Sequence, residues 1–445
     1  MPGSARSTIF ALASGVGRAG VAVYRLSGPE AGRALESLAG GPLPPARQAC
    51  RRKLYGTDGE LVDDGLVLWF PAPHSFTGED VVELQLHGGR AVASAVTEAL
   101  LDLSLRPAEP GEFSRRAFEA GKLDLTQAEA IADLVAADTA AQRRQALGQL
   151  GGGLGHLYED WRQRLLRFQA HLEADIDFSD EDLPGGLSEG ARDGLAILAA
   201  EIDRHLADGG RGERLREGLS VAIVGAPNVG KSSLLNRIAG RDAAIVSSQA
   251  GTTRDVIEVH LDLGGYPVVV ADTAGLRDTA EVVEEEGVRR ARARAESSDV
   301  RLVVFDAELL PELDDSSLGL VGEGSLVVVN KGDRAGREIP ETIAGQAVLL
   351  VSALDGAGID AMLTALQARA AAILDGTGAP AITRARHRVA LEEAVAAIGR
   401  ALAAPLAELA AEDVRMAVRA IGRITGRVDV EDMLDLVFRE FCIGK

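Results

Sequence analysis

The feature that most constrains the fold of this chain is a glycine-rich loop at residues 225–232, with the sequence GAPNVGKS. The loop follows the apolar run 221–224 directly and precedes a segment of helical periodicity, which is the context that a phosphate-binding loop requires. Backbone N–H groups of such a loop surround phosphates at the N-terminus of a helix. Apolar runs of strand length alternate with helical segments around it, which is typical of a parallel α/β sheet. These runs are 221–224, 268–270, 301–305, 326–329 and 348–351.

Three further motifs come at the ends of later runs, in the order expected of a guanine-nucleotide hydrolase. The segment 272–275 (DTAG) offers Asp272 to a magnesium ion through water and the Gly275 amide to a γ-phosphate. The segment 330–333 (NKGD) ends in a carboxylate that can accept both N1–H and the exocyclic amine of guanine, which adenine does not offer. The segment 352–354 (SAL) completes a lid over the base. Together with the loop, these motifs predict a GTPase.

The motifs assign roles at the nucleotide site. Lys231 reaches the β- and γ-phosphates and is the first predicted catalytic residue, and Ser232 ligates magnesium together with Thr253 in the segment 251–255 (GTTRD). The predicted GTP contacts are Asn228, Val229, Gly230, Lys231, Ser232, Ser233, Ser247, Ser248, Gln249, Ala250, Gly251, Thr252, Thr253, Asp272, Thr273, Ala274, Gly275, Asn330, Lys331, Asp333, Ser352, Ala353 and Leu354.

Hydrolysis in this chain requires a group other than the glutamine of Ras-type enzymes. The residue after the DTAG segment is Leu276, whereas Ras-type enzymes orient the attacking water with a glutamine. Asn228 within the phosphate loop and a long switch segment, 241–253, are typical of GTPases that bind a potassium ion beside the phosphates.

The rest of the chain predicts a multidomain protein. Residues 1–122 contain strand-like runs and a helical segment and predict a mixed α+β domain, whereas helical texture runs over 123–216 and again over 377–445. A capping box is predicted at Thr126–Glu129. The Ras-like, doubly wound α/β domain at 217–376 is therefore expected to be inserted into a helical domain.

Composition excludes several classes of protein. The formal net charge of −20 is opposite to that of a protein that coats nucleic acid non-specifically. Cys50 and Cys442 are too few for a disulfide framework or a four-thiolate zinc site. No apolar run approaches the roughly 18 residues of a membrane span, and no secretory signal is evident, so we expect a cytoplasmic protein without a membrane partner.

Lysine is rare in this chain, which makes its positions informative. Only five of the 47 basic residues are lysines, so arginine is the ordinary cation here. Lysine is expected to persist where a compact ammonium is needed. Four of the five lie in motifs, and Lys53 alone has no assigned role. The motif lysines are Lys122, Lys231, Lys331 and Lys445.

Over essentially its whole length the chain resembles the MnmE (TrmE) family of tRNA-modification GTPases. Outside the G domain the resemblance rests on four groups of residues, of which the terminal one is the most specific. Glu119-Ala120 departs from the Leu-Asn that relatives often carry, but it affects no named role. The four groups are 76–80 (FTGED), 110–114 (PGEFS) with 116–118 (RAF), 122–125 (KLDL) with 127–130 (QAEA), and 441–445 (FCIGK).

The resemblance implies a potassium-dependent mechanism. Two G domains of a homodimer face each other, and the ion takes the place of an arginine finger. The family's water-positioning carboxylate falls on Glu284, the second predicted catalytic residue, although the neighbouring Glu285 and Glu286 leave that assignment open. The implied potassium ligands are Asn228, Ser247, Gln249 and Thr252.

The resemblance also implies a reaction on tRNA. With an FAD-dependent partner, MnmG (GidA), such a protein builds an aminomethyl or carboxymethylaminomethyl group on C5 of the wobble uridine. The one-carbon unit comes from a tetrahydrofolate, as its 5-formyl or methylene form, bound by the N-terminal domain, which also dimerises. The implied folate contacts are Arg25, Glu83, Lys122 and Lys445.

Several alternatives stay open at this point. Taken singly, Arg25 and Glu83 are also compatible with a surface salt bridge, which contributes little. Cys442 is a candidate for a chemical role, and His87 is either a site residue or, as we favour, a histidine satisfied in a turn. A non-catalytic GTP-dependent scaffold and a ribosome-assembly GTPase share the G-domain motifs. A ribosome-assembly GTPase would not account for the FCIGK segment or for the folate-type N-terminal domain.

The potassium assignment predicts that GTP turnover is low in sodium and rises markedly in potassium. The reason is that Asn228 is present and the catalytic glutamine is absent. Phosphate release measured in the two chloride salts at matched ionic strength tests this, and equal rates would contradict the assignment.

Replacement of Glu284 by alanine is expected to slow hydrolysis and leave nucleotide affinity nearly intact. A group that positions water acts in the transition state and not in the ground state. Single-turnover hydrolysis and GTP affinity are the measurements. A larger loss of rate in Glu285→Ala would place the carboxylate one residue further along.

Overall fold

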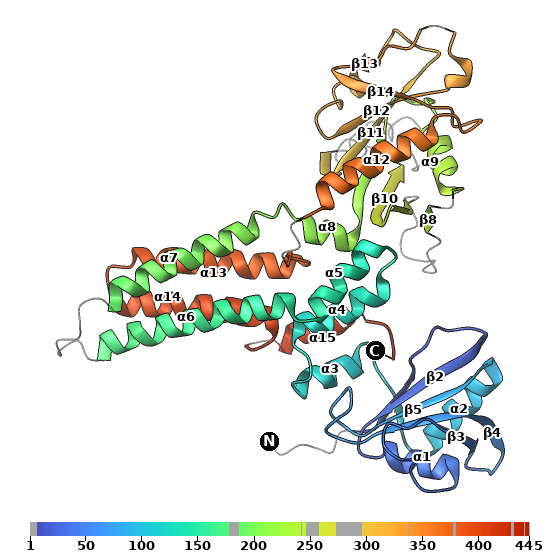
Figure 1. Ribbon diagram of the computed structural model, residues 1–445, viewed down its shortest axis with the longest axis vertical. Coiled ribbons are helices and arrows are strands. Elements are labelled where there is room, and N and C mark those ends of the chain that lie inside the picture. Colours follow the sequence, from blue (N-terminus) through green and yellow to red (C-terminus); the bar gives the residue numbers. More distant parts are fainter. Residues whose placement is uncertain are drawn as a thin grey trace, which may run out of the picture. The chain divides into compact units, whose positions relative to one another are not determined.

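The computed structural model describes residues 7–177, 187–241, 243–245, 258–272, 296–336, 338–376, 380–428, 431–439 and 441–444 (Figure 1). The chain divides into two compact units. The first comprises Met1–Val135, Gln149–Leu195 and Ala396–Lys445, and the second comprises Ala136–Gly148 and Ala196–Val395. Among the helices of the described residues, none is long and apolar enough to cross a membrane.

The first unit contains a six-stranded sheet with the strand order β3-β4-β5-β2-β1-β6. Neighbouring strands are antiparallel except for the last pair, β1 and β6, which is parallel. The strands are β1 (Ile9–Leu12), β2 (Ala19–Ser27), β3 (Cys50–Tyr55), β4 (Leu61–Phe70), β5 (Val81–Gly88) and β6 (Arg106–Pro107).

Helices α1 (Ala31–Ala39) and α2 (Arg90–Asp102) pack on this sheet and form its apolar core. Val82 and Leu84 of β5 belong to this core. Glu83 lies between them and points to the opposite face, because side chains alternate along a strand. The side of the sheet away from α1 and α2 therefore carries the polar residues of β2 and β5.

The helices of the first unit pack mainly as two groups. Helices α6 and α14 lie side by side along much of their length (Figure 1). A separate apolar cluster joins Leu125 and Ala128 of α4 to Leu434 and Phe438 of α15 and to Phe441 beyond it. These helices are α3 (Glu112–Glu119), α4 (Leu125–Ala136), α6 (Gly153–Asp177), α14 (Ala407–Thr425) and α15 (Glu431–Arg439).

The capping box at the start of α4 is formed two residues earlier than predicted. The Asp124 carboxylate accepts from the Gln127 backbone N–H at 2.9 Å, and the Gln127 side chain accepts from the Asp124 N–H at 3.0 Å. This is the reciprocal pattern of a capping box. The Thr126 hydroxyl donates to Asp124 instead of capping the helix, so the prediction at Thr126–Glu129 was wrong.

The second unit is built on an eight-stranded sheet with the order β13-β14-β12-β11-β7-β10-β9-β8. Its five central strands are mutually parallel and correspond to the five predicted apolar runs. The antiparallel strand β9 was missed, although its sequence, EVHLDL, alternates polar and apolar residues as a half-buried strand does. The strands are β7 (Leu219–Val224), β8 (Ala244–Ile245), β9 (Glu258–Leu263), β10 (Tyr266–Asp272), β11 (Val300–Asp306), β12 (Ser325–Asn330), β13 (Thr342–Ile343) and β14 (Gln346–Leu350).

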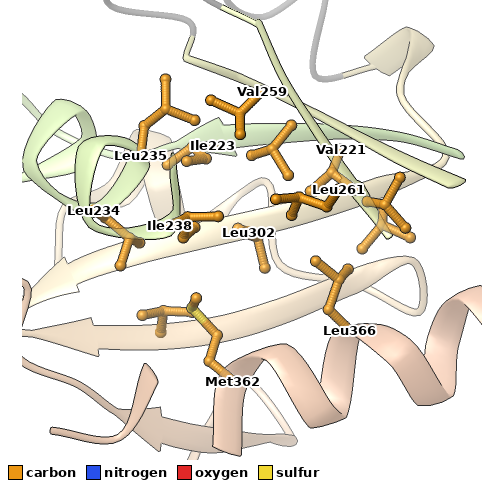
Figure 2. Close-up of a cluster of buried hydrophobic side chains, with 14 of the residues drawn as sticks. Val221, Ile223, Leu234, Leu235, Ile238, Val259, Leu261, Leu302, Met362 and Leu366 are labelled. Carbon is orange, nitrogen blue, oxygen red and sulfur yellow. The ribbon is translucent and has the colours of Figure 1, made fainter. Parts of the chain in front are cut away.

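Both faces of the central strands are buried, as expected of a doubly wound sheet. Val221 and Ile223 of β7 pack against helices α9 and α12 on one face (Figure 2). Ala222 and Val224 belong to a second apolar cluster. The helices of this unit are α8 (Arg211–Glu217), α9 (Lys231–Ala239), α11 (Asp315–Leu318) and α12 (Ile359–Leu374). Three further helices cross the boundary between the units: α5 (Ala140–Leu150), α7 (Leu187–Leu206) and α13 (Ala385–Ala403).

The segments that enter and leave the α/β domain contact each other. Arg388 of α13 donates to the carboxylates of Asp208 at 3.1 Å and Glu213 at 2.9 Å, and also to the Leu206 carbonyl. The two ends of the α/β domain are thus joined at one place, as is usual for a domain inserted into another.

Candidate active site

The nucleotide motifs meet at the carboxyl ends of the parallel strands. The phosphate loop leaves β7, turns through Asn228 and Gly230, whose φ angles are +66° and +95°, and enters α9 at Lys231. A side chain at position 230 would place its Cβ 2.3 Å from Nδ2 of Asn330, so only glycine fits there. The N-terminus of α9 thus faces the loop that is predicted to hold the phosphates.

Lys231 is held over this loop. Its Nζ donates to the carbonyls of Gly225 at 2.8 Å and Ala226 at 2.9 Å. Burial lowers the pKa of Lys231 below its ordinary value, and the nearby charge of Asp272 opposes this effect. The ammonium is therefore partly desolvated, which strengthens its attraction for an anion.

The two predicted magnesium-site residues in the described part of the chain are in contact. The Ser232 hydroxyl donates to Oδ2 of Asp272 at 2.6 Å, and Asp272 is buried at the end of β10. This pairing places a hydroxyl and a carboxylate together at the start of α9. Hard oxygen donors of this kind are those that magnesium prefers.

Asn330 connects the phosphate loop to the guanine lid. Its Nδ2 donates to the Val229 carbonyl at 2.9 Å, and its Oδ1 accepts from the Ala353 N–H at 3.0 Å. Asn330 is only 2% exposed, so both ends of its amide need such partners. The hydroxyl of Ser352 donates to Asp333 at 2.7 Å and ties the predicted base reader to the same lid.

Lys331 has a partner that sequence reasoning missed. Its Nζ lies 2.5 Å from Oδ2 of Asp306, the last residue of β11, and 3.6 Å from Glu308. Lys331 adopts a left-handed conformation with φ of +63°. Asp306 follows the predicted strand 301–305 directly, and this position at the carboxyl end of a parallel strand is the sequence signal that could have identified it.

Several predicted site residues lie outside the described part of the chain, so their roles stay predictions. They are Ser247, Ser248, Gln249, Ala250, Gly251, Thr252, Thr253, Thr273, Ala274, Gly275, Glu284 and Lys445.

In the first unit, the predicted folate residues Arg25 and Glu83 face each other across β2 and β5. Nε and Nη2 of Arg25 both donate to Oε1 of Glu83, at 3.1 and 2.9 Å. The guanidinium also lies against two rings, with its Cζ 5.4 Å from the centroid of Phe76 and 5.9 Å from that of Phe113. Such cation–π contacts orient a guanidinium.

Lys122 and the terminal segment contact residues that neighbour the elements of the Arg25–Glu83 pair. The Lys122 Cε is 3.5 Å from where a Cβ would stand on Gly78, two residues after Phe76. The backbone of Gly444, with φ of +97°, lies so close to Leu12 that an added Cβ would be 2.4 Å from its carbonyl oxygen. Since Leu12 is next to Ala11, the strand partner of Arg25, the chain end approaches this region.

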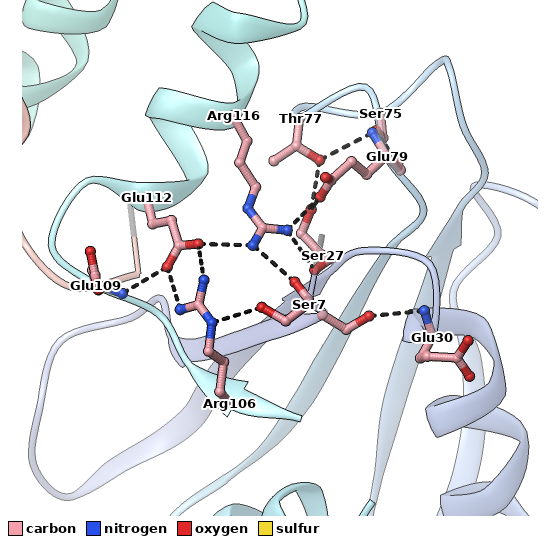
Figure 3. Close-up of polar contacts among 11 residues, drawn as sticks. Ser7, Ser27, Glu30, Ser75, Thr77, Glu79, Arg106, Glu109, Glu112 and Arg116 are labelled. Carbon is pink, nitrogen blue, oxygen red and sulfur yellow. Dashed lines mark hydrogen bonds and ion pairs between the residues drawn. The ribbon is translucent and has the colours of Figure 1, made fainter. Parts of the chain in front are cut away.

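A buried ionic network joins the loop that carries Phe76 to helix α3, which carries Phe113 (Figure 3). Arg116 is 4% exposed and donates to Glu79 at 2.8 Å and Glu112 at 2.8 Å, and also to the Ser7 carbonyl. Arg106 makes two further bonds to Glu112, at 2.8 and 2.6 Å. The family-like segments 76–80 and 110–116 therefore bind each other, a relation that their positions in sequence did not indicate.

The two remaining candidate residues, His87 and Cys442, are both exposed. Both the backbone N–H and the Nδ1 of His87 contact the Asp63 carboxylate at 2.8 Å. The His87 ring is therefore hydrogen-bonded as expected, but the residue lies near the end of strand β5 and not in a turn. Cys442 is exposed, and its carbonyl accepts from the Gly111 N–H at 3.5 Å.

A phosphate loop at a helix N-terminus, a serine–aspartate pair and an Asn-Lys-x-Asp segment bonded to that loop define a P-loop GTPase. Comparison with known proteins gives the particular family. Residues 8–122 match the family model described as GTP-binding protein TrmE N-terminus. Residues 125–442 match the MnmE helical domain, a span that encloses the α/β domain and agrees with its insertion.

Full-length relatives agree with these matches. The chain is 61% identical over 438 residues to the tRNA modification GTPase MnmE of Paramagnetospirillum magneticum, covering 98% of this chain and 99% of the relative. It is 59% identical over 452 residues to that of Rhodospirillum rubrum, with 98% and 99% covered. The chain belongs to the MnmE family of tRNA modification GTPases.

The ionic network predicts a specific sensitivity to acid. Burial alone would raise the pKa of Glu112, but hydrogen bonds from Arg106, the Glu109 N–H and Arg116 lower it from 4.5 to about 2. A carboxyl whose pKa is lower in the folded state stabilises the fold above its ordinary pKa. That contribution, on the order of 3 kcal/mol, is lost as the pH falls from about 5 towards 2.

The free energy of unfolding, measured against pH, should therefore fall less steeply between pH 5 and 3 in Glu112→Gln than in the wild type. Glu119→Gln is the matched control, since Glu119 makes a more exposed pair with Arg115 at 3.2 Å. Parallel curves for the wild type and Glu112→Gln would contradict the assignment.

Proposed function

We propose that this chain, as a homodimer in the cytoplasm, modifies C5 of the wobble uridine of certain tRNAs together with an FAD-dependent partner of the MnmG (GidA) kind. The added group is aminomethyl or carboxymethylaminomethyl, and its one-carbon unit comes from a tetrahydrofolate. The observation that carries this proposal is the Arg25–Glu83 pair, with Gly444 of the FCIGK segment lying against the neighbouring strand β1, in a chain that also holds a GTPase site. Neither feature is needed for GTP hydrolysis itself.

The chemistry of the pair suits a pterin with a glutamyl tail. A carboxylate such as Glu83 can accept two hydrogen bonds from an aminopyrimidine edge. Both bonds from Arg25 end on Oε1 of Glu83, which leaves Oε2 for a ligand. Arg25 and Lys122 supply cations for the tail carboxylates, and Lys445 would add a third. A bound tetrahydrofolate would supply the one-carbon unit.

The terminal segment is the second support for the proposal. A chain end normally frays, but here Phe438 and Phe441 are buried, with ring centroids 5.1 Å apart. Gly444 then lies against Leu12 of β1. A segment held in this way can present Cys442 and Lys445 to the folate region with little loss of conformational entropy on binding.

In the G domain, Ser232 and Thr253 would ligate magnesium, with Asp272 holding it through water. Asn228, Ser247, Gln249 and Thr252 would hold potassium. Lys231 would stabilise charge on the β- and γ-phosphates, and Glu284 would orient the attacking water. The left-handed conformation of Asn228 and the contact between Ser232 and Asp272 support these assignments. Magnesium and potassium supply positive charge for the developing phosphate oxyanions.

Two other functions share the G domain but explain less of the chain. A ribosome-assembly GTPase leaves the Arg25–Glu83 pair and the docked end without a purpose. A non-catalytic scaffold would need GTP binding but not hydrolysis, so a Glu284 variant that binds GTP would still support modified uridine.

Deletion of 442–445 is expected to abolish wobble-uridine modification and to leave potassium-stimulated GTP hydrolysis intact. The finer variant is Gly444→Ala, which keeps every functional side chain and pushes the segment away from the Leu12 carbonyl. Nucleoside mass spectrometry of tRNA and a phosphate-release assay on the same protein are the measurements.

Gly59→Ala is the matched control for this experiment. Its φ is +82°, so the backbone strain is comparable, but an added Cβ would meet nothing within 4 Å. If both the deletion and Gly444→Ala modify tRNA at the wild-type level, the terminal segment and Lys445 are not part of the folate site, and the assignment is wrong.

A further inference from the structure

Arg237 is an arginine at the nucleotide site that none of the nucleotide motifs assigns. It lies in the last turn of α9 and reaches the loop 352–358, which follows β14 and carries the guanine lid. Its Nε donates to the Ala353 carbonyl at 2.9 Å, and its Nη2 donates to the Leu354 carbonyl. One guanidinium therefore binds two consecutive carbonyls of the lid.

Within the lid, Ala353 packs against the apolar core of the sheet, whereas Leu354 does not contribute to it. Leu354 is 70% exposed, and Gly356 and Gly358 have φ angles of +91° and +73°. The lid is attached to its surroundings by polar contacts: the Ala353 N–H to Asn330, the Ser352 hydroxyl to Asp333, and the two carbonyls to Arg237. Hydrogen bonds that involve a charged group, here those of Arg237 and Asp333, are stronger than those between neutral groups.

The direction of these bonds matters for the base. In a planar trans peptide the carbonyl and the following N–H point to opposite sides. When the Ala353 carbonyl faces Arg237, the Leu354 N–H must face away from it. A peptide N–H can meet the 6-carbonyl of guanine but not the 6-amine of adenine, because two donors cannot form a hydrogen bond.

The same residues line a cavity of roughly 620 Å³ at the predicted nucleotide site. Phosphate-loop, base-reading and lid residues all contribute to it. Its lining includes Gly230, Asn330, Asp333, Arg237, Ala353 and Leu354.

A single helix links the two ends of this site. Helix α9 begins at Lys231, over the phosphate loop, and Arg237 comes six residues later, about 9 Å along the axis. We propose that Arg237 is a positioning residue that holds the guanine lid from the phosphate-binding helix, and so determines how long a guanine nucleotide stays bound. Asp333 reads the base edge, whereas Arg237 orients the backbone that covers it.

The test is the dissociation rate of fluorescent methylanthraniloyl-GDP from the full-length chain, followed by chase with unlabelled GDP. Arg237→Ala is expected to release GDP roughly ten- to a hundredfold faster, the range that corresponds to loss of hydrogen bonds from a charged donor. Arg369→Ala is the matched control. It removes the same charge and an arginine–carbonyl bond, to Glu323 at 2.6 Å, that lies outside the cavity.

Inosine diphosphate separates lid positioning from base reading. Inosine keeps the 6-carbonyl and lacks the exocyclic amine that Asp333 is predicted to bind. Arg237→Ala should therefore weaken GDP and IDP by the same factor and leave their ratio unchanged. Arg237→Lys, which keeps the charge but has no fork to span two carbonyls, should give an intermediate rate.

Three results would overturn the proposal. They are a release rate for Arg237→Ala within twofold of the wild type, an equal acceleration in Arg369→Ala, and a changed GDP-to-IDP ratio. If Arg237→Ala does not fold, Arg237→Lys decides, and a wild-type rate in that variant would equally overturn it.

Discussion

A buried polar side chain must find a hydrogen-bond partner at each of its polar ends, and in each unit one such residue organises the site. In the second unit it is Asn330, whose amide binds the phosphate loop through Val229 and the lid through Ala353. In the first unit it is Arg116, whose guanidinium binds Glu79, Glu112 and the Ser7 carbonyl. Loss of either would remove hydrogen bonds from several buried or half-buried groups, and a group left without any partner costs more than the bond itself is worth.

Most of the second unit could be predicted from the sequence because its strands and motifs are each marked by short, continuous stretches of sequence. Parallel strands buried on both faces form continuous apolar runs, so β7, β10, β11, β12 and β14 were found. The phosphate loop and the base-reading segment follow two of them at fixed spacing. Strand β9, which pairs with β10, was missed because the prediction used continuous apolar runs. The alternation of polar and apolar residues in EVHLDL is the signal that could have found it.

The rest could not be predicted, because it depends on contacts between distant residues. The segments 76–80 and 110–116 were recognised from resemblance alone, and their mutual binding through Arg116 joins positions 37 residues apart. Arg237 carried no signal, since arginine is the ordinary cation of this chain and its carbonyl partners lie 116 and 117 residues away. Periodicity and motif spacing do not report such pairs.

The two rings beside Arg25 show how a structural network can serve a site without touching its ligand. Glu79 and Glu112, the partners of Arg116, lie in the same short segments as Phe76 and Phe113. The network therefore fixes the backbone that places both rings against the guanidinium. Because the Gly111 N–H binds the Cys442 carbonyl, the same segment also touches the chain end. The ionic network thus contributes mainly rigidity here. The proposed role of Glu83, to present one oxygen to a folate, requires that its partner Arg25 is held in one orientation.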